Sequence, residues 1–225
     1  VPFNNLATIP GTVQAENYDL GGQGISYYDN TTGNTPAAFR SEDVDVETTT
    51  DAGGGYNIGY TANGEWLEYT VNVQQAGTYT LQARVASALT TTGQLTVMMD
   101  GVNVSGTITI PGTGGWQTWQ TVTSPSFYLS AGQKVMRVNI IAAGFNLNYI
   151  NVVRVVTNQL PTVSLTSPLN NASFASPANI ALTATANDAD GTIAQVSFYN
   201  GTTLLSTDLT APYAFNWTNV LAGSY

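Results

Sequence analysis

Alternation of apolar and polar residues with a period of two is the feature that most constrains how this chain folds. Between residues 66 and 73 every second side chain is apolar, which is the pattern of a strand with one buried face. Similar runs flank an Asp-Gly pair at 100–101 and an Asn-Gly pair at 200–201, and both pairs are typical of hairpin turns. No stretch of a dozen residues shows the 3.6-residue period of a helix. The sequence therefore predicts an all-β protein built from β-sandwiches.

Two units are predicted along the 225 residues. Residues 1–156 are enough for one complete sandwich, and residues 157–160, which precede Pro161, have the composition of a short linker. Alternating strands resume over residues 161–225. This second stretch is shorter than the roughly 100 residues typical of an immunoglobulin-like sandwich. We therefore expect an incomplete, truncated immunoglobulin-like domain there.

Composition excludes several classes of function. The formal net charge is −9, with 5 Lys and Arg against 14 Asp and Glu, so nucleic acid and anionic membranes are poor partners. Because the chain has no Cys and no His, it lacks the usual nucleophile–histidine pairs and His-ligated zinc. No apolar run approaches the length of a membrane span. Abundant Thr, Asn, Gly and Ser with little Lys predict a secreted protein, and we expect any leader to precede Val1.

Five separated motifs carry a resemblance to a known family. They are IPGTVQAENY at 9–18, TDAGGGYNIGY at 50–60, GEWLEY at 64–69, GGWQTW at 114–119 and FNLNYI at 145–150. Through them, residues 9–156 resemble the family 6 carbohydrate-binding modules, and residues 161–225 resemble a bacterial immunoglobulin-like module. The resemblance implies a jelly-roll-like β-sandwich that binds a polysaccharide or oligosaccharide without catalysis. It also implies a catalytic domain elsewhere in the same parent chain, a secreted glycan-degrading enzyme.

By the same resemblance, the sugar-binding residues are Tyr60, Trp116, Asn146 and Glu47. The chemistry agrees, because a pyranose has an apolar face that stacks on flat aromatic rings and a rim of hydroxyls that needs fixed polar partners. Glycines precede both rings, which favours exposed loop positions over core positions. The alternatives are a turn residue that caps its own backbone for Asn146 and a solvated strand-edge charge for Glu47.

Two further aromatic residues and one long stretch bear on the core and on the ligand. Trp119 and Tyr69 lie in strand-like contexts, so we expect both in the core. The extra stretch at residues 21–42 either walls the site or covers a sheet. Its length resembles modules of laminarin-degrading enzymes, which makes β-1,3-glucan our leading ligand.

The resemblance also implies a structural calcium ion, held by Gln14, Glu16 and Asn148. Calcium takes six to eight oxygen ligands, so backbone carbonyls or water must complete the set. Alternation places Gln14 and Glu16 on one face of a predicted strand, as a shared ion requires.

Two rival functions remain. The first is a calcium-stabilised adhesion or spacer module without sugar affinity, which is favoured if Tyr60 and Trp116 are buried. The second, less favoured, is a glycoside hydrolase that uses Asp43, Asp45 and Glu47, since alternate strand residues lie about 6.5–7 Å apart, near the separation of glycosidase carboxylates. A cation-binding cluster, or pairing of these acids with Arg40, explains the acidic run more simply. We therefore predict no catalytic residues.

Overall fold

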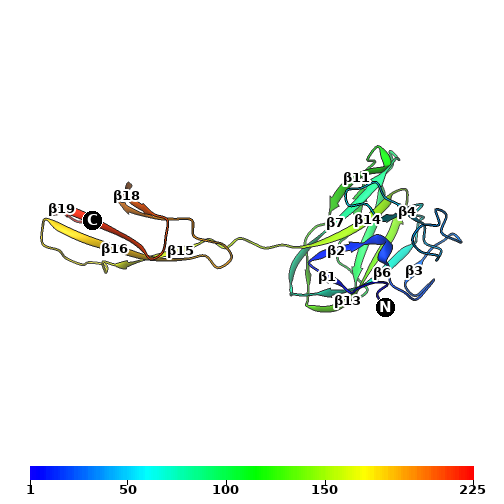
Figure 1. Ribbon diagram of the computed structural model, residues 1–225, viewed down its shortest axis with the longest axis horizontal. Helices are drawn as coiled ribbons and strands as arrows, with labels where there is room; N and C mark the ends of the chain where they lie inside the picture. Colours follow the sequence, from blue (N-terminus) through cyan, green and yellow to red (C-terminus); the bar gives the residue numbers. More distant parts are fainter. The chain divides into compact units, whose positions relative to one another are not determined.

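Figure 1 shows a computed structural model of the protein, which describes residues 1–225. Contacts divide the chain into two compact units, Val1–Val156 and Thr157–Tyr225. Apart from one 3₁₀ turn, η1 (Ala15–Asn17), all regular structure is β-strand, so the all-β prediction is confirmed. The chain contains no helix with the length and apolarity needed to cross a membrane.

The first unit contains two seven-stranded sheets. One sheet has the strand order β1-β6-β13-β8-β10, with β3 paired to β6 and β9 paired to β8. Its strands are β1 (Ala7–Ile9), β3 (Tyr27–Tyr28), β6 (Trp66–Val73), β8 (Gly93–Met99), β9 (Val102–Asn103), β10 (Ile108–Ile110) and β13 (Gly132–Ala142).

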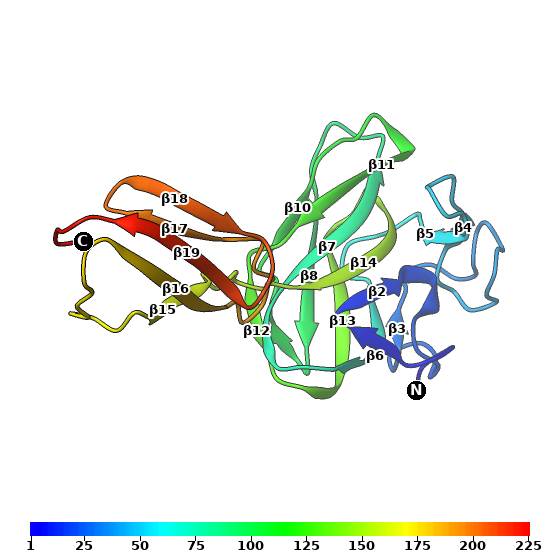
Figure 2. The same ribbon diagram turned by 60° about the vertical axis from the view of Figure 1, so that its left-hand side comes forward.

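The other sheet has the order β11-β7-β14-β5-β4, with β12 paired to β7 and β2 paired to β14. Its strands are β2 (Gly11–Gln14), β4 (Val46–Thr48), β5 (Tyr56–Ile58), β7 (Gly77–Ser87), β11 (Gly115–Thr123), β12 (Phe127–Leu129) and β14 (Asn146–Arg154). Figure 2 shows the short strands β4 and β5 at one edge of this sheet. A single cluster of buried apolar side chains drawn from both sheets forms the core of the unit.

Strand β6 follows the predicted alternation, with its odd-numbered residues buried and its even-numbered residues partly exposed. Tyr69, on the buried face, is 3% exposed, as expected of a core residue. Trp66 faces outward, and the Arg137 guanidinium lies 3.9 Å from its ring centroid while also pairing with Glu68. The hairpin predicted at Asp100 joins β8 to β9, because Met99 pairs with Val102 across the turn.

The stretch at residues 21–42 extends the fold. Its strand β3 adds to the first sheet through β6. Near its end, Arg40 is buried, with its guanidinium 3.5 Å from the ring centroid of Tyr18 and 4.1 Å from that of Phe3. The same guanidinium forms a 2.7 Å ion pair with Glu42. Arg40 therefore fixes this stretch against the core.

The second unit is a smaller β-structure. It contains a three-stranded sheet, β15-β16-β19, and a two-stranded hairpin, β17-β18. These strands are β15 (Thr162–Ser167), β16 (Ala178–Asn187), β17 (Val196–Asn200), β18 (Thr203–Asp208) and β19 (Tyr213–Val220). The hairpin turns at Gly201, as predicted. Val163 and Leu165 on β15 remain 67% and 54% exposed, so this unit buries its apolar residues less completely than the first.

Candidate functional site

Two aromatic rings of the first unit are exposed at the positions predicted for sugar binding. Tyr60 is 62% exposed and follows β5, and Trp116 is 44% exposed. Trp116 lies inside β11 rather than in the loop that the glycines predicted. Alternation along β11 places Trp116 on the more exposed face of the strand. The pairing of β11 is irregular there, since Gly115 pairs with Ser87 and the next paired residue is Gln120, so residues 116–119 leave the regular ladder.

A hydrogen-bonded cluster of four side chains lies next to the backbone at Gly59 and Trp116, and we call it the polar hub. It consists of Glu47, Asn57, Gln117 and Asn146. One carboxylate oxygen of Glu47, Oε1, accepts hydrogen bonds from the amide nitrogens of Asn57 at 3.0 Å, Gln117 at 3.0 Å and Asn146 at 2.6 Å. The hub therefore joins strands β4, β5, β11 and β14 through one charged acceptor.

The hub reaches both rings through the backbone. The amide nitrogen of Asn146 also donates to the carbonyl oxygen of Trp116 at 2.8 Å. On the other side, Gly59 lies against the hub, since a Cβ atom at this position would be 3.2 Å from the Glu47 carboxylate and 3.4 Å from Asn146 Oδ1. Tyr60 is the next residue. Of the four residues predicted for sugar binding, Glu47 and Asn146 thus belong to the hub, Trp116 contacts it through its carbonyl, and Tyr60 follows the glycine that lies against it.

Sequence reasoning missed two members of the hub, Asn57 and Gln117. The amide nitrogen of Gln117 donates to Asn57 Oδ1 at 3.1 Å, and its oxygen accepts from the backbone N–H of Thr50 at 2.9 Å and from the Trp119 indole at 3.3 Å. Both residues lie within motifs at 50–60 and 114–119, beside the aromatic residues that drew the assignment. Trp119 is half-buried and lies outside the core cluster, so the expectation of a core position was wrong. The face of β11 that carries Trp119 is only half-buried, like Gly115 and Gln117 on the same face.

Of the predicted calcium ligands, Glu16 has the clearest structural signature. Its side chain is buried, and its Oε2 atom has no hydrogen-bond partner. Burial raises the pKa of Glu16 to about 7, because removing a carboxylate from water penalises its charged form. An orphaned, buried carboxylate oxygen fits a cation site, since a bound cation would supply the missing partner. Asn148 is also buried, and its amide donates to Asp51 at 2.9 Å, which leaves its oxygen available as a ligand.

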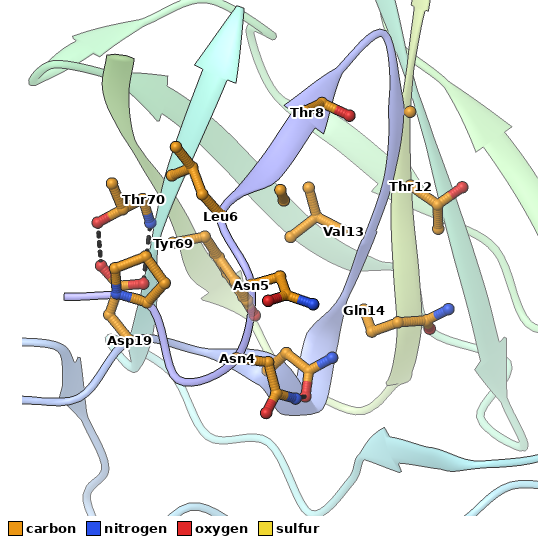
Figure 3. A pocket seen from close by; sticks show the side chains of 14 residues that line it. Asn4, Asn5, Leu6, Thr8, Thr12, Val13, Gln14, Asp19, Tyr69 and Thr70 are labelled. Carbon is orange, nitrogen blue, oxygen red and sulfur yellow. Dashed lines mark hydrogen bonds between the residues drawn. The ribbon is translucent and has the colours of Figure 1, made fainter.

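Gln14, the third predicted calcium ligand, differs from Glu16 and Asn148 in being exposed. Strand β2 ends at Gln14 and Glu16 belongs to η1, so the strand face that the two residues were predicted to share does not exist. The side chain of Gln14 is exposed and lines a cavity of about 610 Å³ together with Asn4, Asn5 and Thr12 (Figure 3). No hydrogen bond joins it to Glu16 or Asn148.

The acidic run at residues 43–47 does not form the alternating strand face that the hydrolase alternative needs, because β4 begins only at Val46. Asp43 accepts a hydrogen bond from the backbone N–H of Gly33 at 2.8 Å, and Asp45 accepts one from that of Thr35 at 2.5 Å. Both carboxylates therefore hold the preceding loop. Arg40 pairs with Glu42 and not with these acids, so that alternative is also wrong.

Together, the two-sheet sandwich and the exposed rings near a polar hub are features of a β-sandwich binding module. Comparison with known proteins identifies the family. The profile of the carbohydrate binding module family 6 matches residues 36–154, and that of a bacterial Ig domain matches residues 161–225. The chain therefore belongs to carbohydrate binding module family 6, a family of non-catalytic modules, and carries an Ig-like domain after the module.

Individual relatives agree with this assignment. The chain is 32% identical over 119 residues to the clotting factor G alpha subunit of Tachypleus tridentatus. This match covers 52% of this chain and 17% of the relative. It is 33% identical over 125 residues to the beta-agarase AgaA of Microbulbifer thermotolerans. This second match covers 56% of this chain and 24% of the relative. The chain thus spans less than a quarter of the length of these curated relatives.

A solved structure shows the same fold. It is a carbohydrate binding module from Cellvibrio mixtus lichenase 5A in complex with cellotriose. The sequence identity is 36% and the TM-score 0.50, and the match covers 65% of this chain and 98% of that module.

Proposed function

We propose that the first unit binds a β-glycan by stacking a sugar ring on Tyr60 and Trp116 above the polar hub. The observation that carries this proposal is the exposure of both rings beside the hub, at 62% and 44%. Exposed aromatic rings next to fixed hydrogen-bonding groups suit a pyranose, which has an apolar face and a polar rim. The spacer alternative, in which the module lacks sugar affinity, was favoured if these rings were buried, and they are not.

The leading ligand is a β-1,3-glucan, on the likeness of the 21–42 stretch to modules of laminarin-degrading enzymes. Two relatives supply the comparison ligands: cellotriose, which occupies the lichenase module, and agarose, from the name of the beta-agarase. Those two relatives also support the proposal that the chain is part of a secreted glycan-degrading enzyme. Glu16 and Asn148 are proposed to hold a structural calcium ion, whose binding would supply a partner for the buried Glu16 oxygen.

The test uses isothermal titration of the 225-residue chain with laminarin oligosaccharides, cellotriose and agarose oligosaccharides. Replacing a desolvated aromatic anchor typically costs about 2 kcal/mol or more, roughly thirtyfold in affinity. We therefore expect Trp116→Ala and Tyr60→Ala to abolish measurable binding of the preferred sugar without lowering the melting temperature.

The matched control is Tyr128→Ala, because Tyr128 is 67% exposed on β12, outside the hub. This variant should bind like the wild type. Normal binding by Trp116→Ala would show that the sugar does not stack at this site.

A further inference from the structure

The polar hub has an uneven supply of hydrogen-bonding groups. Each of its three amide nitrogens has two protein acceptors within hydrogen-bond distance, so all six N–H hydrogens are consumed inside the protein. Their acceptors are Glu47 Oε1 and the Ile58 carbonyl for Asn57, Glu47 Oε1 and Asn57 Oδ1 for Gln117, and Glu47 Oε1 and the Trp116 carbonyl for Asn146. The hub therefore has no amide donor left for a ligand.

The orientation of Asn146 follows from its neighbours. Its amide nitrogen faces two acceptors, a carboxylate oxygen and a carbonyl oxygen. A flipped amide would place its own oxygen against both, with no proton between them. The nitrogen therefore points into the protein, and Asn146 keeps only an acceptor. This differs from the donor and acceptor pair that an asparagine in a sugar site usually offers.

Two acceptors of the hub remain unused. Glu47 Oε2 and Asn146 Oδ1 have no hydrogen-bond partner in the protein, and neither is among the fully buried atoms that lack one. Both atoms therefore keep some contact with solvent, Glu47 on a half-buried side chain and Asn146 on one that is 3% exposed. Gly59 lies against these two side chains without a Cβ atom that would crowd them.

No cation neutralises the hub. Four of the five basic side chains are paired with acids elsewhere, and Arg154 lies against Gly77. The two rings contribute only neutral donors, a phenol and an indole.

We propose that this site selects glycans by charge, because the hub offers acceptors and one negative charge but no donor. It would accept hydroxyl groups, which can donate, and ammonium groups of amino sugars, which donate and carry the opposite charge. It would exclude uronic acids, whose carboxylates can only accept and would face Glu47. This inference rests on the proposed sugar site and names the chemical class of its ligand.

The experiment compares three ligands with one backbone. Whichever neutral glucan binds, laminarin or a β-1,4-glucan, is used unmodified, oxidised to the uronate at C6, and aminated at C6. Affinity for the full chain is measured by titration at low and at high salt. We expect the oxidised glucan to bind at least about tenfold more weakly than the neutral one, since like charges in contact are strongly disfavoured. The aminated glucan should bind at least as tightly as the neutral one, with an advantage that salt removes.

Two variants of equal net charge locate the effect. Glu47→Gln should shrink the ratio of aminated to oxidised affinity by about tenfold. Asp100→Asn removes a charge at the β8–β9 turn, away from the hub, and should leave the ratio unchanged. Glu47→Gln also changes the hydrogen bonding of the hub, so its melting temperature is measured to check that the first unit remains folded. The comparison of the three ligands with the wild-type chain tests the proposal even if this variant is unstable.

Each outcome decides the proposal. Equal binding of oxidised and neutral glucan overturns charge selection while the sugar site stands. An equal change of the ratio in both variants overturns it as well, because it attributes the selection to the overall charge. Failure of every neutral glucan to bind overturns the proposed function itself.

Discussion

Gln117→Ala should both destabilise the first unit and weaken sugar binding, because one side-chain amide bonds to five residues. Its nitrogen donates to Glu47 and Asn57. Its oxygen accepts from the backbone and hydroxyl of Thr50, the hydroxyl of Thr49 and the indole of Trp119. Truncation removes all six bonds together. It also leaves the Glu47 carboxylate with two amide donors in place of three.

The expected magnitude follows from these bonds. A neutral hydrogen bond contributes about 0.5–1.5 kcal/mol net, and one to a charged group about 1.5–3 kcal/mol. Because Gln117 is only half-buried, water can replace part of the loss. We therefore expect about 3 kcal/mol of destabilisation, or a fall of about 6–12 °C in melting temperature for a unit of this size. Gln117 also fixes the backbone next to Trp116, whose ring is proposed to stack on the sugar. Losing this support should lower sugar affinity about tenfold.

Differential scanning calorimetry and titration of the full chain with the preferred glucan measure the two effects. Gln117→Glu is the informative partner variant, because it keeps the acceptor for Thr50 and Trp119 but places a second carboxyl against Glu47. Like charges raise the pKa of one carboxyl, so the folded state binds a proton that the unfolded state releases. Stability should therefore be present at acid pH and be lost as pH rises through that raised pKa.

Two results would refute this reasoning. A Gln117→Ala variant that melts within about 2 °C of the wild type and binds normally would show that the hub does not hold the site. A Gln117→Glu variant with the same melting temperature at pH 5 and pH 8 would show that the new carboxyl does not face Glu47.

Three further predictions concern metal, pH and local stability. Chelation with EDTA should lower the melting temperature of the first unit, because an ion bound only by the folded state stabilises it. Calcium should not change the melting temperature of a Glu16→Ala, Asn148→Ala double variant. A wild-type melting curve that EDTA leaves unchanged, together with no metal by elemental analysis, would exclude these ligands. Burial raises the pKa of Glu65 from 4.5 to about 7, so the folded state binds the Glu65 proton more tightly than the unfolded state does. Stability should therefore fall as pH rises from about 4.5 to 7. Thermal melts of Glu65→Gln should show a weaker dependence on pH. Limited proteolysis should cut first within residues 157–225, where apolar strand residues stay exposed, and early cleavage within residues 1–156 would contradict this order of stability.

The strand pattern and the exposure of two aromatic rings were predictable from the sequence because they depend on local signals. Period-two alternation reports which face of a strand is buried, and it predicted β6 with its buried Tyr69. Asp-Gly and Asn-Gly pairs predicted two hairpin turns from backbone preference alone. The resemblance carried by the motifs named Tyr60 and Trp116, and the glycines before them predicted that both rings are exposed, as they are.

The polar hub, in contrast, is decided by tertiary structure alone. Asn146 and Glu47 are 99 residues apart in the chain, and Gln117 and Glu47 are 70 apart, so no local pattern reports their contact. The sequence named Asn146 and Glu47 but could not tell which amide hydrogens the protein itself would use. That depends on where β4, β5, β11 and β14 place their side chains relative to one another, and it converts an asparagine from a donor and acceptor into an acceptor only. The burial of Glu16 in η1 and the register break in β11 also depend on tertiary structure, because no local pattern reports which distant residues pack or pair with these segments.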